Sequence, residues 1–169
     1  MEASWIAIVW RLPSGSSTPR VTIWRALKRL GAASLTPGGA LLPFREDLLE
    51  QVGWIAQDID QMGGDAWVLP VTELTEAEES RVRSQANAER DVEYRELAQE
   101  ASELERTTRG DTLTDRDIAT LKGRLERIRA RDHYGAARGP SAIRAVQRCL
   151  RSLALRRPRT TPPVATKVR

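Results

Sequence analysis

The sequence is poor in the residues from which disulfides and metal sites are built. It has one cysteine, Cys149, and one histidine, His133, among 169 residues. A single cysteine cannot form an internal disulfide, and these two residues cannot supply the four ligands of a structural zinc site. The sequence therefore predicts no metal site and no cofactor.

Long apolar runs and an amino-terminal leader are also missing. No stretch approaches the roughly 20 consecutive apolar residues of a membrane span, and no charged segment followed by an apolar one opens the chain. Aromatic residues make up 5% of the chain and charged residues 30%, which is typical of a soluble protein with highly charged helices. We therefore expect a cytoplasmic protein that contacts no membrane and consists of one domain, with or without a helical appendage.

Charge is distributed unevenly along the chain. Residues 111–169 carry 15 basic and 5 acidic side chains, a balance of +10. Residues 75–110 carry 6 basic and 10 acidic side chains, and residues 1–74 carry 6 and 8. The excess of positive charge thus lies in the C-terminal part, as in many proteins that bind nucleic acid, although a basic tail also aids solubility or binds other polyanions.

The first 74 residues alternate between strand and helix patterns. Short apolar runs predict strands, and apolar residues at spacings of three and four predict helices. Strands are predicted over residues 5–12, in a hairpin at 33–43 and over 66–74, and helices over 20–31 and 46–62. Pro70 suits an edge strand, because proline cannot donate a backbone hydrogen bond. This order predicts a ferredoxin-like α+β domain over residues 1–74, in which a split βαβ sheet carries both helices on one face.

A helical extension is predicted over residues 75–155. Thr75 and Glu78 match a capping box, and the stretch that follows to Arg106 lacks proline and glycine. This stretch predicts a long exposed helix whose thin apolar stripe needs a partner. The stripe consists of Val82, Ala86, Val92, Leu97, Ala101 and Leu104.

Two further helices are predicted over residues 114–131 and 141–155. Both carry clean apolar stripes, and we expect them to pack as a hairpin. Residues 156–169 are rich in proline, threonine and arginine and have almost nothing to bury. They predict a disordered basic tail.

Cys149 and His133 are the one pair that resembles a nucleophile and a base. They fall in different predicted helical regions, and Cys149 lies beside an apolar stripe. His133 stands near a predicted helix end, where an imidazole can meet free carbonyl groups. We therefore favour structural roles for both and predict no enzymatic activity. An oxidoreductase is the enzymatic alternative, and it would have only Cys149.

The candidate DNA-binding residues lie on the last two predicted helices. They are Lys122, Arg124, Arg127, Arg129, Arg131, Arg144, Arg148 and Arg151. Guanidinium groups bind phosphate oxygens through paired hydrogen bonds, so we expect these eight cations to contact double-stranded DNA. In the competing interpretation, the arginines pair with the acidic helix of residues 75–106. Arg20 and Arg25 are candidate anion-binding residues, with simple solvation as the alternative, and Trp24 beside them is either a stacking platform or part of the core.

Three motifs stand in a fixed order along the chain: VTIWRALKRLGA at 21–32, GGDAWVL at 63–69 and RARDHYGA at 129–136. Together with the pattern of the first strand and the hairpin, they resemble the N-terminal domain of ChrB, a family of bacterial chromate-resistance regulators. The likeness covers roughly Trp5 to Leu155. The first half is also distantly similar to the ferredoxin-like domain of the repressor PaaX and to the small CRISPR spacer-acquisition subunit, which supports the fold alone.

The resemblance to ChrB implies a transcriptional regulator that binds the promoter of a chromate-resistance operon and responds to chromate. The last two predicted helices are joined by a longer connection than a helix-turn-helix normally has, so we expect DNA contact through the basic helices or the tail. The rival hypothesis is a protein-interaction or scaffold module with a dimeric ferredoxin-like platform. A homodimer, formed through the sheet edge or the long helix, is expected in both cases.

Overall fold

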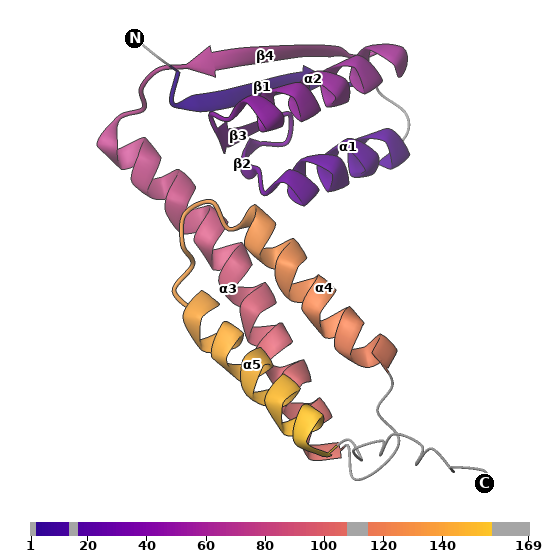
Figure 1. The fold of residues 1–169 in the computed structure, drawn as a ribbon. Coiled ribbons are helices and arrows are strands. Elements are labelled where there is room, and N and C mark those ends of the chain that lie inside the picture. The colour runs from indigo at the N-terminus through magenta and orange to yellow at the C-terminus, as the bar shows by residue number, and fades with distance from the viewer. Residues whose placement is uncertain (1–2, 14–16, 108–114, 157–169) are drawn as a thin grey trace, which may run out of the picture.

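A computed structural model describes residues 3–13, 17–107 and 115–156 of the protein. Figure 1 shows a sheet with two helices at the top and three longer helices that descend from it. The elements are β1 (Trp5–Arg11), α1 (Ser17–Leu30), β2 (Ala33–Thr36), β3 (Gly39–Pro43), α2 (Glu46–Gln61), β4 (Asp65–Val71), α3 (Glu76–Thr107), α4 (Asp115–Arg131) and α5 (Gly139–Arg156). The predicted tail lies outside the described residues from residue 157 onward.

The four strands form one antiparallel sheet in the order β2-β3-β1-β4. Strand β1 lies in the interior of the sheet and pairs with both β3 and β4. This is the order of the split βαβ unit, so the predicted ferredoxin-like α+β class is confirmed. Strand β4 is an edge strand, which agrees with the position expected for Pro70.

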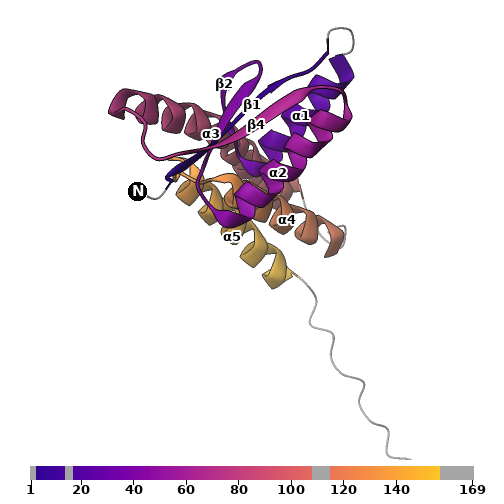
Figure 2. The same cartoon turned by 90° about the horizontal axis from the view of Figure 1, so that it is seen from above.

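One face of the sheet is covered by α1 and α2. Alternate residues of a strand point to opposite faces, and Ile6, Ile8 and Trp10 of β1 point toward these helices. They pack with Leu27 of α1 and Val52 of α2, which are completely buried. Figure 2 shows both helices on one side of the strands and the start of α3 on the other. This layer is the main hydrophobic core.

The other face of the sheet is only partly covered. Trp5 and Leu41 are buried beneath Val82 of α3. Farther along the same face, Trp67 and Leu69 of β4 remain 55% and 47% exposed. The long helix thus begins as a cover for one half of the sheet and leaves the other half open.

Helices α3, α4 and α5 form a three-helix bundle with its own core. The fully or largely buried members of this core are Tyr94, Leu97, Ala101, Leu121, Leu125, Ile128, Val146 and Cys149. Helix α4 runs antiparallel to α3, and α5 runs parallel to it (Figure 1). Helices α4 and α5 therefore do not pack simply as the expected hairpin, because α3 contributes the third wall of their core.

The predicted start of α3 is confirmed, but one residue of its stripe is wrong. The Glu78 N–H donates to Thr75 Oγ1 at 3.3 Å, and the Thr75 N–H donates to Glu78 Oε2 at 3.0 Å. These bonds form the capping box, and the hydrogen bonds from Thr75 lower the pKa of Glu78. Val92 is 42% exposed, whereas Tyr94 is buried. Two residues differ by about 200° around a helix, so only one of them can face the bundle core.

Two helices begin earlier than the sequence predicts. Helix α1 starts at Ser17 and α5 at Gly139, so Pro19 and Pro140 lie in first turns. Proline is tolerated there because the first backbone N–H groups of a helix have no partner within it. Within the described residues, no helix is long and apolar enough to cross a membrane.

Candidate nucleic-acid interface

The RARDHYGA motif forms the joint between the bundle and the sheet domain. Asp132 accepts hydrogen bonds from the Tyr94 hydroxyl at 3.1 Å and from the Ala136 N–H at 2.9 Å. Tyr134 packs against Trp5 of β1, with their ring centroids 5.9 Å apart. The motif therefore holds the connection between α4 and α5 against both neighbouring parts.

His133 completes this joint. Its Nε2 lies 2.7 Å from the carbonyl oxygen of Leu30 at the end of α1. A carbonyl oxygen can only accept, so the Nε2–H donates this bond. Burial lowers the pKa of His133, and Arg45 adds to the effect, while the Leu30 bond and Asp132 act in the opposite direction. The predicted structural role at a helix end is confirmed, although the helix is α1 rather than α4.

Gly31 allows the two parts to approach closely. Its φ is +81°, a conformation that L side chains rarely adopt. A Cβ atom at this position would lie 2.7 Å from the Arg131 carbonyl oxygen and 2.9 Å from His133 Nε2. Only glycine fits where α1 meets the end of α4.

Cys149 is completely buried in the bundle core, as its expected structural role requires. His133 lies instead at the joint, against Leu30. In the described part of the chain, no three His, Cys, Asp or Glu side chains are placed so that they could hold a metal ion.

Two of the predicted DNA-binding arginines are held in close ion pairs by α3, and a third, Arg148, forms a longer pair with Glu105 of the same helix. Arg124 binds Glu96 at 3.1 Å and also binds Glu100. Arg131 binds Glu93 at 3.3 Å, and its side chain is only 21% exposed. Burial lowers the pKa of Arg131 despite this carboxylate. For these two residues, the structure contains the pairing with the acidic helix that the competing interpretation describes.

The other six predicted residues are more accessible. Arg129 lies 3.6 Å from Glu126 on its own helix, and Arg148 lies 3.9 Å from Glu105. Four cations form no ion pair with a described residue: Lys122, Arg127, Arg144 and Arg151. DNA binding by any of these residues stays a prediction.

The two candidate anion-binding residues, Arg20 and Arg25, are both exposed on α1. Arg20 lines a cavity together with Trp10 and Trp24, whereas Arg25 is not among its lining residues. The structure therefore does not bring the two arginines to one site. Trp24 is half-buried and packs against the main core, as the second of its two interpretations expects.

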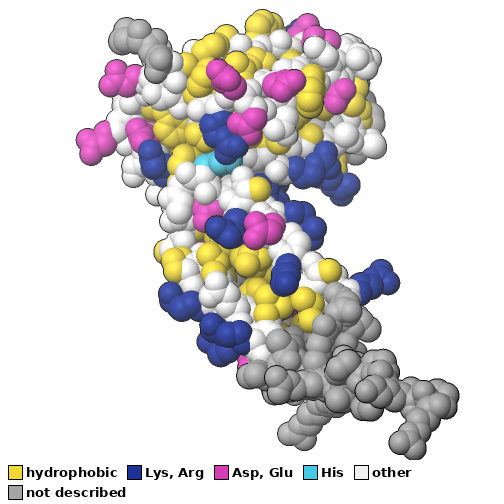
Figure 3. Space-filling model, viewed as in Figure 1, with side chains coloured by type: hydrophobic (Ala, Val, Ile, Leu, Met, Phe, Trp, Pro, Cys, Tyr) yellow, Lys and Arg dark blue, Asp and Glu magenta, His cyan; other side chains and the backbone are white. Residues whose placement is uncertain are grey.

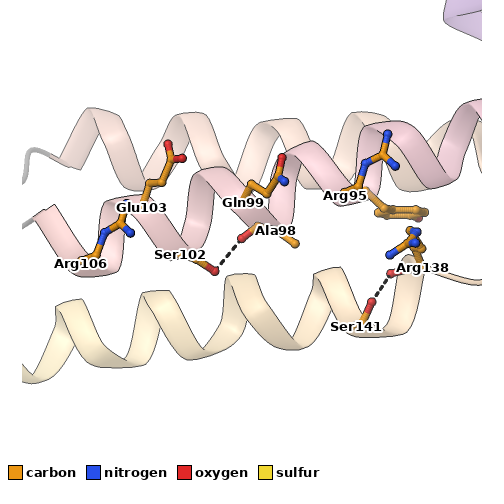
Figure 4. A pocket seen from close by; sticks show the side chains of 9 residues that line it. Arg95, Ala98, Gln99, Ser102, Glu103, Arg106, Arg138 and Ser141 are labelled. Carbon is orange, nitrogen blue, oxygen red and sulfur yellow. Dashed lines mark hydrogen bonds between the residues drawn. The ribbon is translucent and has the colours of Figure 1, made fainter.

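A groove between α3 and α5, hereafter the α3/α5 groove, encloses about 380 Å³. Figure 4 shows Arg138 and Arg95 near one end and Arg106 at the other, with Ser102 and Ser141 between the helices. The Ser102 hydroxyl donates to the Ala98 carbonyl and the Ser141 hydroxyl to the Arg138 carbonyl, both at 2.8 Å. The groove thus presents guanidinium and hydroxyl groups, which are common phosphate ligands.

The three groove arginines are exposed, and none forms an ion pair with a described residue. Glu103 is the one acidic side chain among the lining residues of this groove. Asp91 Oδ1 accepts the backbone N–H of Arg138 at 2.8 Å, and the Arg138 guanidinium takes no part in this bond.

Sequence reasoning missed Arg95, Arg106 and Arg138. The first two lie in a segment with an acidic balance, and the third lies in a connection. One signal was present, because Arg95, Gln99, Ser102 and Arg106 recur at the spacing of one helical face.

The predicted arginines of α5 are not among the residues that line the groove, but they share a helical face with one that is. Ser141, Arg144, Arg148 and Arg151 have the spacing of one helical face, and Ser141 lines the groove. The basic strip is defined as the cations of the groove lining and of this α5 face that form no ion pair with a described residue: Arg95, Arg106, Arg138, Arg144 and Arg151. On the face shown in Figure 3, most of the acidic side chains lie on the sheet domain, and basic side chains are the more numerous along the bundle.

Two comparisons with known proteins cover most of the chain. The family model for the N-terminal part of protein ChrB matches residues 20–156. Protein ChrB of Cupriavidus metallidurans is 34% identical over 145 residues, which cover 86% of this chain and 40% of that relative. The chain thus spans less than half the length of this relative, and no solved structure matches it. The matched region includes the Gly31 and His133 contacts that join the two parts, and the chain belongs to the ChrB family.

Proposed function

We propose that the protein is a DNA-binding transcriptional regulator in chromate resistance and that it contacts the DNA backbone through the basic strip. The observation that carries the proposal is the set of five exposed arginines on α3, on α5 and at the end of the connection before α5 that form no ion pair with a described residue. Membership of the ChrB family supports the link to chromate resistance.

The length of the basic strip suits a DNA backbone. A helix rises 1.5 Å per residue, so Arg95 and Arg106 are separated by roughly 16 Å along α3. Successive base pairs are about 3.4 Å apart along a duplex, so this distance corresponds to about five phosphates of one strand. Contacts of this kind position a protein on DNA without reading its sequence.

The proposal leaves Arg124 and Arg131 outside the interface. Their guanidinium groups already bind α3 carboxylates, and a phosphate would have to displace these partners. Lys122, Arg127 and Arg129 lie on α4 and do not line the α3/α5 groove. They serve as the internal control for the proposal.

The decisive experiment removes three positive charges either from the α3/α5 groove or from α4. The variant Arg95→Gln/Arg106→Gln/Arg138→Gln is compared with Lys122→Gln/Arg127→Gln/Arg129→Gln, which has the same net charge. Binding to a duplex from upstream of the protein's own gene is measured by fluorescence polarisation at several salt concentrations. Each lost phosphate contact lowers the salt slope by about 0.9, so the first variant should lose about 2.7 and the second much less. Equal losses in the two variants would contradict the proposal.

Regulation by chromate needs a separate arm of the experiment. The same duplex and a scrambled one are titrated with the wild-type protein, with and without chromate. A regulator should prefer the upstream duplex, and chromate should abolish that preference. A preference that chromate leaves unchanged would limit the proposal to DNA binding.

One feature favours the alternative of a protein-interaction module. Val9, Trp67 and Leu69 leave apolar side chains exposed on the outer face of the sheet, and Val9 and Trp67 are directly paired across β1 and β4. Exposed apolar patches often mark protein interfaces. Equal, weak binding to both duplexes would support this alternative. The expected homodimer also stays a prediction, which sedimentation analysis of the wild-type protein can test.

A further inference from the structure

A second cavity lies on the sheet domain, between α1 and the β2–β3 hairpin, and encloses about 470 Å³. Trp10 of β1 and Trp24 of α1 line it, with their ring centroids 6.0 Å apart and their planes inclined by 37°. The backbone N–H of Trp10 donates to the Gly38 carbonyl at 2.7 Å. This bond holds the hairpin turn beside the two indoles.

The rim of the cavity exposes apolar side chains to water. Ser34 pairs with Ala40 and Thr36 with Gly39, so Leu35 is an extra residue in an irregular β2–β3 ladder. Such a bulge redirects a side chain, and Leu35 lines the cavity while remaining 46% exposed. A bound apolar group would remove this surface from water.

Arg20 supplies the charge of the cavity. It is exposed and forms no ion pair with any residue in the described ranges. Lys28 lies 5.9 Å from the Trp24 ring centroid, but its Nζ is 3.5 Å from Glu89 Oε1. Arg20 is therefore the cation available to a ligand, with the hydroxyls of Ser34 and Thr36 on the opposite wall.

The ratio of charged to apolar groups in the cavity indicates which class of ligand it can bind. A small inorganic dianion loses strong hydration on binding and needs several charged donors in return. This cavity offers one guanidinium and walls that are largely aromatic and aliphatic. Ligand sites of this composition are typical for organic molecules with few polar groups. We propose that the cavity binds planar aromatic monocarboxylates, with the ring against Trp10 and Trp24 and the carboxylate on Arg20.

The test uses 1-naphthoate as the probe and the wild-type chain without DNA. The protein has five tryptophans, and their indole N–H signals are resolved by nuclear magnetic resonance. Naphthoate should shift the signals of Trp10 and Trp24 while those of Trp54 and Trp67, on other surfaces, stay in place. The neutral analogue 1-naphthalenemethanol should bind more weakly. If naphthoate shifts neither of the two cavity signals, the proposal is wrong.

Arg20 and Arg25 provide a matched pair of variants on one helix. Arg20→Gln should weaken naphthoate binding roughly fivefold to tenfold, because an exposed guanidinium–carboxylate pair contributes modestly. Arg25→Gln should leave it unchanged, and neither variant should alter binding of the neutral analogue. If the two variants weaken naphthoate binding equally, the loss reflects only the lower net charge of the protein, and Arg20 does not bind the carboxylate.

Sodium chromate provides the opposing probe. If chromate shifts the signals of Trp10 and Trp24 at lower concentration than naphthoate does, the cavity is an oxyanion site and the proposal is wrong. The inference does not depend on DNA binding. Arg20→Gln is expected to retain the DNA affinity and salt slope of the wild type, so failure here and failure of the DNA-binding proposal are separate results.

Discussion

The two sides of α3 differ in whether their charged residues are paired with a neighbouring helix or exposed. Toward α4, Glu93, Glu96 and Glu100 bind arginines of the neighbouring helix. Toward α5, Arg95 and Arg106 line an open groove and form no ion pair with described residues, and the pair between Glu105 and Arg148 is long, at 3.9 Å. The difference teaches that an arginine-rich helix becomes structural or available according to the acidic residues of the face it meets. A count of charges along the chain does not distinguish these cases.

The largest effect is expected at Gly31, where the end of α1 contacts the end of α4. Gly31→Val would place a branched side chain at φ +81° and within 3 Å of backbone and His133. We expect a loss of about 3 kcal/mol in the free energy of unfolding, measured by urea titration. Gly53→Ala in α2 is the control, because nothing lies within 4 Å of the added Cβ. The control should gain about 0.5 kcal/mol, and equal losses would contradict the role of Gly31.

Removing an arginine from each side of α3 tests the comparison directly. Arg124→Gln deletes the partner of Glu96 and Glu100, and its side chain is 35% exposed. We expect a loss of about 1 kcal/mol in the free energy of unfolding, since the pair is partly solvated. Arg95→Gln, on the groove side, should change stability by less than about 0.5 kcal/mol. Thermal and urea unfolding of both variants provide the measurement, and a larger loss for Arg95→Gln would reverse the comparison.

A pH-dependent effect is expected at the joint. Burial lowers the pKa of His133 below its ordinary value of 6.5, so the unfolded chain takes up a proton first as the pH falls. Stability should be constant at higher pH, should begin to fall near pH 6.5 and should level off below the folded pKa. His133→Gln keeps a donor for Leu30 but does not titrate in this range. The difference in unfolding free energy between wild type and variant, followed from pH 8 to 5, should show this fall, and parallel curves would argue against it.

The smallest effect concerns the single carboxylate in the lining of the α3/α5 groove. Glu103→Gln removes a negative charge beside the basic strip and should tighten DNA binding about twofold at low salt. Glu50→Gln on α2, an exposed residue of the sheet domain, removes the same charge at a distance. Fluorescence polarisation should show a gain for the first variant alone. A similar gain in both would indicate that only the net charge matters.

The sheet domain was predictable because its elements have strong local signals. Apolar runs of strand length, a Pro-Gly-Gly turn and two amphipathic helices together specify the order of the split βαβ unit. The bundle was predictable as a set of helices but not in its packing. The position of α3 against both α4 and α5 depends on contacts between residues far apart in the sequence, such as Tyr94 and Asp132. Val92 was misplaced for a related reason, because a thin stripe leaves two possible faces to a helix.

The candidate site was predictable only in part. Helical spacing placed the arginines of α4 on one face and those of α5 on another, but it could not show which individual arginines meet carboxylates of α3. Arg138 lies at the end of a connection, where no periodicity applies, and its position depends on the bond from its N–H to Asp91. The structural roles of Cys149 and His133 followed from their local surroundings alone.

The length of α3 has a consequence for how the molecule unfolds. The helix has 32 residues, and it contributes Val82 to the cover of the sheet and Leu97 to the core of the bundle. Neither core is complete without its own segment of this helix, and the two segments are joined by continuous backbone hydrogen bonds. Disorder that starts in one part therefore reaches the other through the same helix. We therefore expect the covered half of the sheet and the bundle to lose their structure in a single transition.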